Sequence, residues 1–107
     1  MEAKVIFSNE QLKEAFESLK NSDEELYKKL EKARNDIAHN AFCGRNVKKK
    51  LIPKSLIQKY NINNLWIYNL SKDWRLLYNI ATPDKIEILA IILEWMDHKD
   101  YEKLFKF

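Results

Sequence analysis

The spacing of apolar residues changes near the middle of this chain, from a helical period to an alternating one. Before residue 60, apolar residues recur three and four positions apart, which indicates amphipathic helices. After residue 64, β-branched and aromatic residues dominate three segments separated by polar turns, as is typical of strands. The 107 residues are therefore expected to form one α+β domain, with an N-terminal helical hairpin packed on one face of a small antiparallel sheet.

Two capping boxes predict where the helices begin. Ser8 with Gln11, and Ser22 with Glu25, match the S-x-x-E/Q pattern. The apolar positions that follow them are Leu12, Ala15, Phe16 and Leu19 in the first helix and Leu26, Leu30, Ala33 and Ile37 in the second. Because only a few residues separate the two helices, they should form an antiparallel hairpin.

The segment between the hairpin and the strands contains two further signals. Asn40 and the single glycine, Gly44, can adopt the left-handed conformation that ends a helix, so the second helix is expected to end there. Pro53 suits the first turn of a short helix at residues 53–60. The inward face of this helix would hold Leu56, Ile57 and Tyr60.

Four strands are predicted, a short one at residues 4–7 and a C-terminal meander at residues 65–70, 74–81 and 85–95. Both alternating faces of the last strand are apolar. One face would contain Ile86, Ile88, Ala90 and Ile92, and the other Leu89, Ile91, Leu93 and Trp95. This strand is therefore expected in the centre of the sheet, covered on both faces.

The basic residues are concentrated in one segment, although the net charge is only +3. Residues 45–60 contain no acidic residue and six basic ones, Arg45, Lys48, Lys49, Lys50, Lys54 and Lys59. A local positive field of this kind suits a polyanion such as nucleic acid. The alternative is a solvated lysine-rich loop.

The residue counts argue against several kinds of site. One glycine allows neither a G-x-G-x-x-G fingerprint nor a P-loop, so no nucleotide cofactor is expected. One cysteine and two histidines cannot build a Cys/His zinc site, so no metal is expected. The lone Cys43, the absence of a secretory leader and the lack of a stretch long enough to span a membrane predict a cytoplasmic protein.

Arg75 stands inside the apolar run of the strand predicted at residues 74–81. A strand position fixes the direction of the guanidinium, which can then bind an anion. The alternative is an arginine whose stem covers the sheet and whose guanidinium pairs with a glutamate, for which Glu94 is a candidate.

His98 and Tyr101 are three residues apart, so a helical tail would place them on one side. Histidine exchanges protons at neutral pH, and tyrosine can donate a proton or stack on a base. These two residues are candidates for acid–base chemistry. Alternatively, His98 caps the last strand and Tyr101 packs on the core.

The order of these elements, together with five short motifs, resembles the RelE/ParE superfamily of bacterial and archaeal type II toxins. The motifs are A-F-C-G at residues 41–44, L-I-P-K at 51–54, N-L-W-I-Y at 64–68, W-R-L-L-Y at 74–78 and D-H-K-D-Y-E-K-L-F at 97–105. For the RelE-like branch, the resemblance implies an endoribonuclease that cuts mRNA on the ribosome, inhibits translation and is silenced by a cognate antitoxin protein. For ParE-like members it implies a gyrase inhibitor, and fold alone does not distinguish the two.

Metal-independent RNA cleavage requires a base at the 2′-hydroxyl, an acid at the leaving 5′-oxygen and cations around the phosphate. The resemblance to RelE-like toxins implies that Arg75 binds the scissile phosphate and that His98 and Tyr101 perform the proton transfers. It also implies backbone contacts to RNA from Arg45, Lys48, Lys49, Lys50 and Lys54. A non-catalytic binding module of the same fold remains the alternative. A sheet with two apolar faces and two long helices is further expected to leave apolar surface for an antitoxin to cover.

Overall fold

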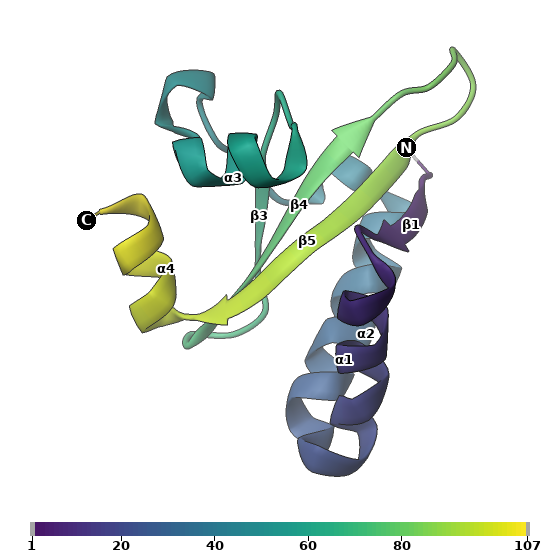
Figure 1. The fold of residues 1–107 in the computed structure, drawn as a ribbon. Helices are drawn as coiled ribbons and strands as arrows, with labels where there is room; N and C mark the ends of the chain where they lie inside the picture. Colours follow the sequence, from purple (N-terminus) through teal and green to yellow (C-terminus); the bar gives the residue numbers. More distant parts are fainter. Residues whose placement is uncertain (1, 107) are drawn as a thin grey trace.

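The computed structural model describes residues 2–106 and confirms the predicted α+β fold (Figure 1). The elements in chain order are β1 (Lys4–Phe7), α1 (Glu10–Ser22), α2 (Glu24–His39), the 3-10 turn η1 (Ala41–Cys43), β2 (Arg45–Asn46), the 3-10 turn η2 (Lys49–Leu51), α3 (Lys54–Tyr60), β3 (Trp66–Asn69), β4 (Trp74–Ala81), β5 (Leu89–Asp97) and α4 (His98–Phe105). Within the described residues, no helix combines the length and the apolar character needed to cross a membrane.

The strands form one five-stranded sheet in the order β1-β5-β4-β3-β2. Strands β2 to β5 pair antiparallel, as predicted, whereas β1 pairs parallel with β5 and makes the sheet mixed. The parallel strand places β5 between two neighbours, inside the sheet as predicted, although the central strand is β4. The two-residue strand β2 was not predicted, because a segment of that length shows no alternating pattern.

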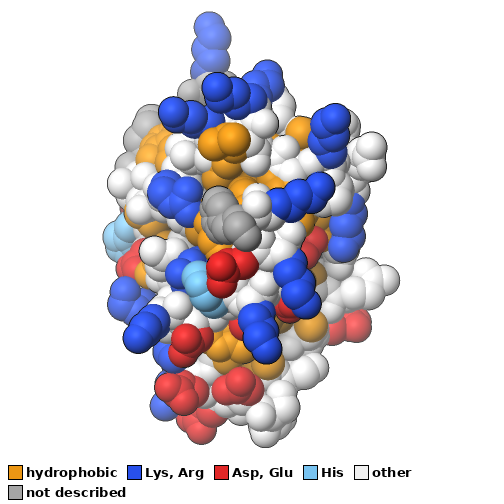
Figure 2. Space-filling model, turned by 90° about the vertical axis from the view of Figure 1, so that its left-hand side faces the viewer, with side chains coloured by type: hydrophobic (Ala, Val, Ile, Leu, Met, Phe, Trp, Pro, Cys, Tyr) orange, Lys and Arg blue, Asp and Glu red, His pale blue; other side chains and the backbone are white. Residues whose placement is uncertain are grey.

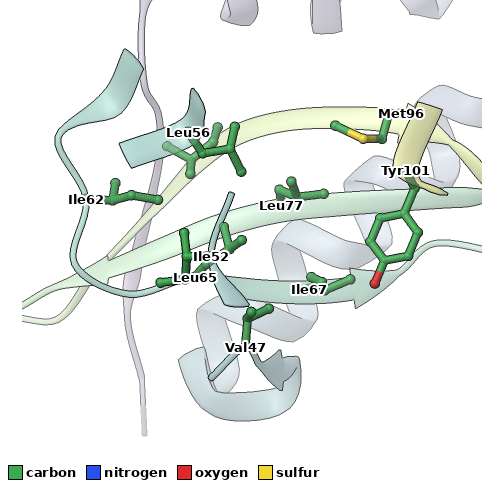
Figure 3. Packing of buried hydrophobic residues seen from close by; sticks show 10 residues of the cluster. Val47, Ile52, Leu56, Ile62, Leu65, Ile67, Leu77, Met96 and Tyr101 are labelled. Atoms are coloured by element: carbon green, nitrogen blue, oxygen red, sulfur yellow. The ribbon is translucent and has the colours of Figure 1, made fainter. Parts of the chain in front are cut away.

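The helices cover both faces of the sheet (Figure 1). The α1–α2 hairpin packs on one face, as predicted, where Phe16, Leu30 and Tyr78 belong to one buried cluster. On the other face, α3 contributes Leu56 and α4 contributes Tyr101 to a second cluster (Figure 3). The apolar residues of this second face are therefore already buried by α3 and α4.

A β-bulge in β5 changes which residues share a face. Leu77 pairs with Glu94 and the next residue, Tyr78, pairs with Ile92, so Leu93 is the extra residue. Trp95 therefore packs with the hairpin-facing cluster, whereas the strict alternation predicted from the sequence placed it beside Leu93. The strand also begins at Leu89, four residues later than predicted, and residues 85–88 belong to the preceding loop.

Several predicted local features are corrected by the structure. The side chains of Asn9 and Asp23 cap α1 and α2, each one residue after the predicted serine, by accepting hydrogen bonds from the backbone N–H groups of residues 12 and 26. Asn40 and Gly44 both have negative φ angles, of −150° and −79°, so neither is left-handed. Two predicted inward residues, Ala15 and Ile57, are exposed.

The single glycine is required by a close approach of the chain to Tyr78. A Cβ atom added at Gly44 would lie 2.6 Å from the Tyr78 hydroxyl oxygen and 2.9 Å from the carbonyl oxygen of Ile67. The Gly44 N–H donates to that hydroxyl at 3.1 Å, and the hydroxyl donates to the carbonyl of Ala41 at 2.7 Å. Tyr78 thus fixes the chain just before β2.

Replacing Gly44 with alanine is expected to lower the free energy of unfolding by about 1–3 kcal/mol. Either the backbone at Ile67 or the buried side chain of Tyr78 must move to make room for the added methyl group. Urea denaturation followed by circular dichroism measures this change. Asn46→Ala, at an exposed position two residues later, is the control and should leave the midpoint nearly unchanged. Equal midpoints for wild type and Gly44→Ala would contradict the close packing.

Asp36 provides a pH-dependent contribution to stability. Hydrogen bonds from the Tyr68 hydroxyl and from the Lys32 ammonium, the latter at 2.9 Å, hold the pKa of the Asp36 carboxyl below its ordinary value. A carboxyl whose pKa is lowered by folding stabilises the folded state above its unfolded pKa, and the stabilisation disappears as pH falls through the lowered value.

The difference in urea midpoint between wild type and Asp36→Asn should therefore be constant near neutral pH and should shrink as pH falls below about 4. Denaturation curves across this range check the result. Glu14→Gln, on an exposed position of α1, corrects for general charge effects. A difference that stays constant down to strongly acidic pH would show that the Asp36 carboxylate does not contribute in this way.

Candidate active site at the start of α4

The strand register brings Arg75, Arg45 and α4 to one place. Arg75 stands two residues before Leu77 in β4, so both side chains point to the face covered by α3 and α4. Arg45 pairs with Ile67, which pairs with Leu77, and directly paired residues share a face. The chain enters α4 beside the start of β4, where the N–H of His98 donates to the carbonyl of residue 73 at 2.8 Å.

Tyr101 is the centre of this cluster. Its side chain is buried, and its hydroxyl accepts a hydrogen bond of 2.6 Å from Nη2 of Arg45. The guanidinium carbon of Arg75 lies 5.5 Å from the centroid of the Tyr101 ring, within the range of a cation–π interaction. Two guanidinium groups therefore contact one phenol, from two strands and one helix that are distant in sequence.

The guanidinium of Arg75 is held by the turn before β4. Its Nη1 atom donates to the carbonyl oxygens of Ser71 at 2.9 Å and of Lys72 and Trp74 at 3.2 Å. Among residues 2–106, no carboxylate pairs with Arg75, so the predicted alternative of an Arg–Glu pair is wrong. Glu94 instead pairs with a lysine, Lys59, at 3.5 Å, and accepts from the hydroxyl of Tyr60 at 2.7 Å.

His98 forms the outer part of the cluster. Its Nε2 atom lies 2.9 Å from Oε1 of Glu102, and its side chain is 51% exposed. Its ring centroid lies 6.5 Å from that of Tyr101. Helical spacing places His98 and Tyr101 together, as expected. Glu102 was missed as a site residue, although the four-residue spacing from His98 predicts the contact.

The lysines of the basic segment do not join this cluster. Lys48, Lys49 and Lys50 lie at η2, and Lys54 begins α3, all exposed. Lys50 and Lys54 line a groove with Phe105, at the end of α4. Eight helical residues span about 12 Å, so this groove and His98 lie at opposite ends of α4.

The fold of this chain, but not its sequence, is similar to that of a known protein. No protein-family model and no curated protein matches this sequence. Among solved structures, the chain is similar to a YoeB/ParE toxin from Agrobacterium tumefaciens, with a TM-score of 0.60 and 12% sequence identity. The match covers 89% of this chain and 98% of that chain. This protein has the fold of a YoeB/ParE toxin. At this level of identity the similarity defines the fold, so the chemistry must be argued from the side chains.

On this fold, the charges of the cluster suit an anionic ligand better than a cation. Arg45 and Arg75 supply two fixed positive charges, and Arg34, the third arginine of the chain, lies on α2 with its guanidinium carbon over Phe7 and Phe16. Among the described residues, no group of three or more His, Cys, Asp and Glu side chains could hold a metal ion. Two arginines beside a tyrosine and a histidine can bind a phosphate and transfer protons.

Proposed function

We propose that this protein, as one domain of residues 1–107, is the toxin of a type II toxin–antitoxin pair. We further propose that it belongs to the RelE-like branch, acts in the cytoplasm and cuts mRNA on the ribosome. The observation that carries the proposal is the convergence of Arg75, Arg45, Tyr101 and His98 at the start of α4. The toxin fold supports the same conclusion.

The proposed reaction is attack of a 2′-hydroxyl on the adjacent phosphorus. The new bond joins the 2′-oxygen to phosphorus, the bond to the 5′-oxygen breaks, and a proton moves from the nucleophile to a base and from an acid to the leaving group. Arg75 would bind the scissile phosphate, because within residues 2–106 only its Nη1 atom has protein hydrogen-bond partners. His98 and Tyr101 would perform the two proton transfers, one as base and the other as acid.

Arg45 has a different role in this proposal from the one expected from its place in the basic segment. Because its Nη2 atom donates to the Tyr101 hydroxyl, it would orient that hydroxyl and add positive charge beside the phosphate. Lys50 and Lys54 would contact RNA only away from the scissile bond, since they line the groove at the far end of α4. Lys48 and Lys49 would contact the RNA backbone from the start of η2.

Expression in a bacterial host, with primer-extension mapping of cellular mRNA, tests the proposal. Growth arrest with cuts in phase with codons supports ribosome-dependent cleavage. Growth arrest with intact mRNA and blocked DNA replication would contradict it and favour the gyrase inhibitor. A short adjacent reading frame that encodes an acidic protein and restores growth would identify the proposed antitoxin.

Inhibition of gyrase is the second candidate, and one observation favours it. Tyr101 is only 5% exposed, so its hydroxyl is not open to a substrate, and the half-exposed imidazole of His98 is paired with Glu102. A protein-binding toxin of this fold would need neither group. The acid–base variants considered in the Discussion distinguish the two candidates.

A further inference from the structure

A groove separates the start of α3 from the end of α4, away from the candidate active site. Its apolar lining comes from Leu51 and Pro53 on one side and from Leu104 and Phe105 on the other. Leu51 is 58% exposed, which makes it one of the most exposed large apolar side chains of the described chain. We call this feature the α3–α4 groove. An aliphatic side chain left this open to water is a suitable contact for a partner.

The rim of the α3–α4 groove is positively charged. Lys50, Lys54 and Lys106 line it, and no acidic side chain does so among the described residues. None of these three lysines has an ion-pair partner within residues 2–106, whereas Lys28, Lys29 and Lys32 on α2 each pair with a carboxylate. Figure 2 shows this face, with Lys and Arg side chains around apolar surface. The groove thus combines an apolar floor with unpaired positive charge.

We propose that the α3–α4 groove binds an acidic peptide segment of a partner protein, with one apolar side chain of that segment seated against Leu51 and Phe105. Charge complementarity favours a peptide rich in aspartate and glutamate. A peptide fits better than single-stranded RNA, because sequence-independent binding of bases uses open aromatic faces. The aromatic residue of the groove, Phe105, instead packs on Tyr101, with ring centroids 4.9 Å apart.

An occupied groove would act on the candidate active site through α4. Phe105 contacts Tyr101, whose hydroxyl is held by Arg45. A peptide bound against Phe105 would hold α4 in place and keep Tyr101 buried beneath Arg75. That this peptide belongs to the antitoxin rests on the proposed function, whereas binding in the groove does not.

Fluorescence anisotropy with a defined probe tests the proposal on the full chain. The probe is a short fluorescein-labelled peptide in which glutamates flank one central leucine. The double variant Lys50→Glu, Lys54→Glu should weaken binding at least roughly tenfold, because it reverses two charges at the rim. The matched control, Lys13→Glu with Lys20→Glu on exposed positions of α1, should change binding by less than about twofold.

The apolar contact has its own test. Leu51→Ser, and separately a probe with serine in place of leucine, should each weaken binding several-fold, roughly as expected for the loss of a buried aliphatic contact. Hydrogen exchange of the α4 amides should slow when the wild-type protein binds the probe. These measurements do not depend on toxicity, so they test peptide binding in the groove independently of the proposed nuclease activity.

Four outcomes would overturn the inference. They are no binding of the probe by the wild-type protein, equal weakening by the groove and control double variants, unchanged binding of the serine probe, and displacement of the peptide by a single-stranded oligouridylate that binds more tightly. The last result would assign the groove to RNA. Circular dichroism confirms that each variant is folded, which is expected because the substituted side chains are exposed.

Discussion

Replacing Arg75 with alanine is expected to lower the rate of mRNA cleavage by about two to three powers of ten, the usual effect of removing one fixed donor to the transition state. Arg75 is oriented by three backbone carbonyls of the turn before β4, so its guanidinium needs little reorganisation when a phosphate binds. Purified ribosomes with a defined mRNA, sampled over time and mapped by primer extension, give the rate.

Two further variants separate this role from simple loss of structure. Lys72→Ala removes a neighbouring exposed cation and leaves the backbone carbonyl that Arg75 uses, so cleavage should stay near the wild-type rate. Arg75→Lys keeps the positive charge but loses the planar, bidentate guanidinium, so its cleavage rate should lie between those of Arg75→Ala and the wild type. Urea midpoints show whether the turn has loosened. A folded Arg75→Ala protein that cleaves at the wild-type rate would remove Arg75 from the mechanism.

Tyr101→Phe and His98→Gln are each expected to slow cleavage by about two to four powers of ten, the range for loss of a general acid or base. Phenylalanine keeps the ring between Arg75 and Phe105 but loses the hydroxyl that accepts from Arg45. Glutamine can still donate to Glu102 but cannot exchange a proton at neutral pH. The same ribosome assay measures both variants.

The control for this pair is Lys103→Gln, an exposed change on α4 away from the cluster, which should leave the rate unchanged. Growth assays with the same variants distinguish the two functions. If Tyr101→Phe and His98→Gln still arrest growth while mRNA stays intact, the nuclease proposal fails and gyrase inhibition becomes the better explanation. If both lose toxicity and cleavage together, the acid–base role is supported.

The elements that were predicted well have strong local signals. The apolar spacing of α2 identified its four buried residues, and the bounds of β4 were predicted at both ends. The errors lie where a signal is short or depends on a distant contact. Strand β2 has two residues, and the bulge at Leu93 depends on pairing with β4. Ile86 suits a strand by residue type, yet it is 95% exposed in a loop.

Only those residues of the candidate site that have a local sequence signal could be proposed from the sequence. Arg75 and the pair His98 and Tyr101 stand out in the sequence, because each is polar beside an apolar run. The contact between Arg45 and Tyr101 joins residues 56 positions apart, and nothing local predicts it. The basic segment suggests one surface in the sequence, but in the structure Arg45 contacts Tyr101, whereas Lys50 and Lys54 line the groove at the far end of α4.

The sequence by itself determined the α+β class, the order of helices and strands, and the residue types available for phosphate binding and proton transfer. These follow from apolar periodicity and composition, which act over a few neighbouring residues. Only the tertiary structure decided that helices cover both faces of the sheet, that Tyr78 requires Gly44, and that Arg45 meets Tyr101. Each of these depends on strand register and on a close approach between distant segments, which no local pattern encodes.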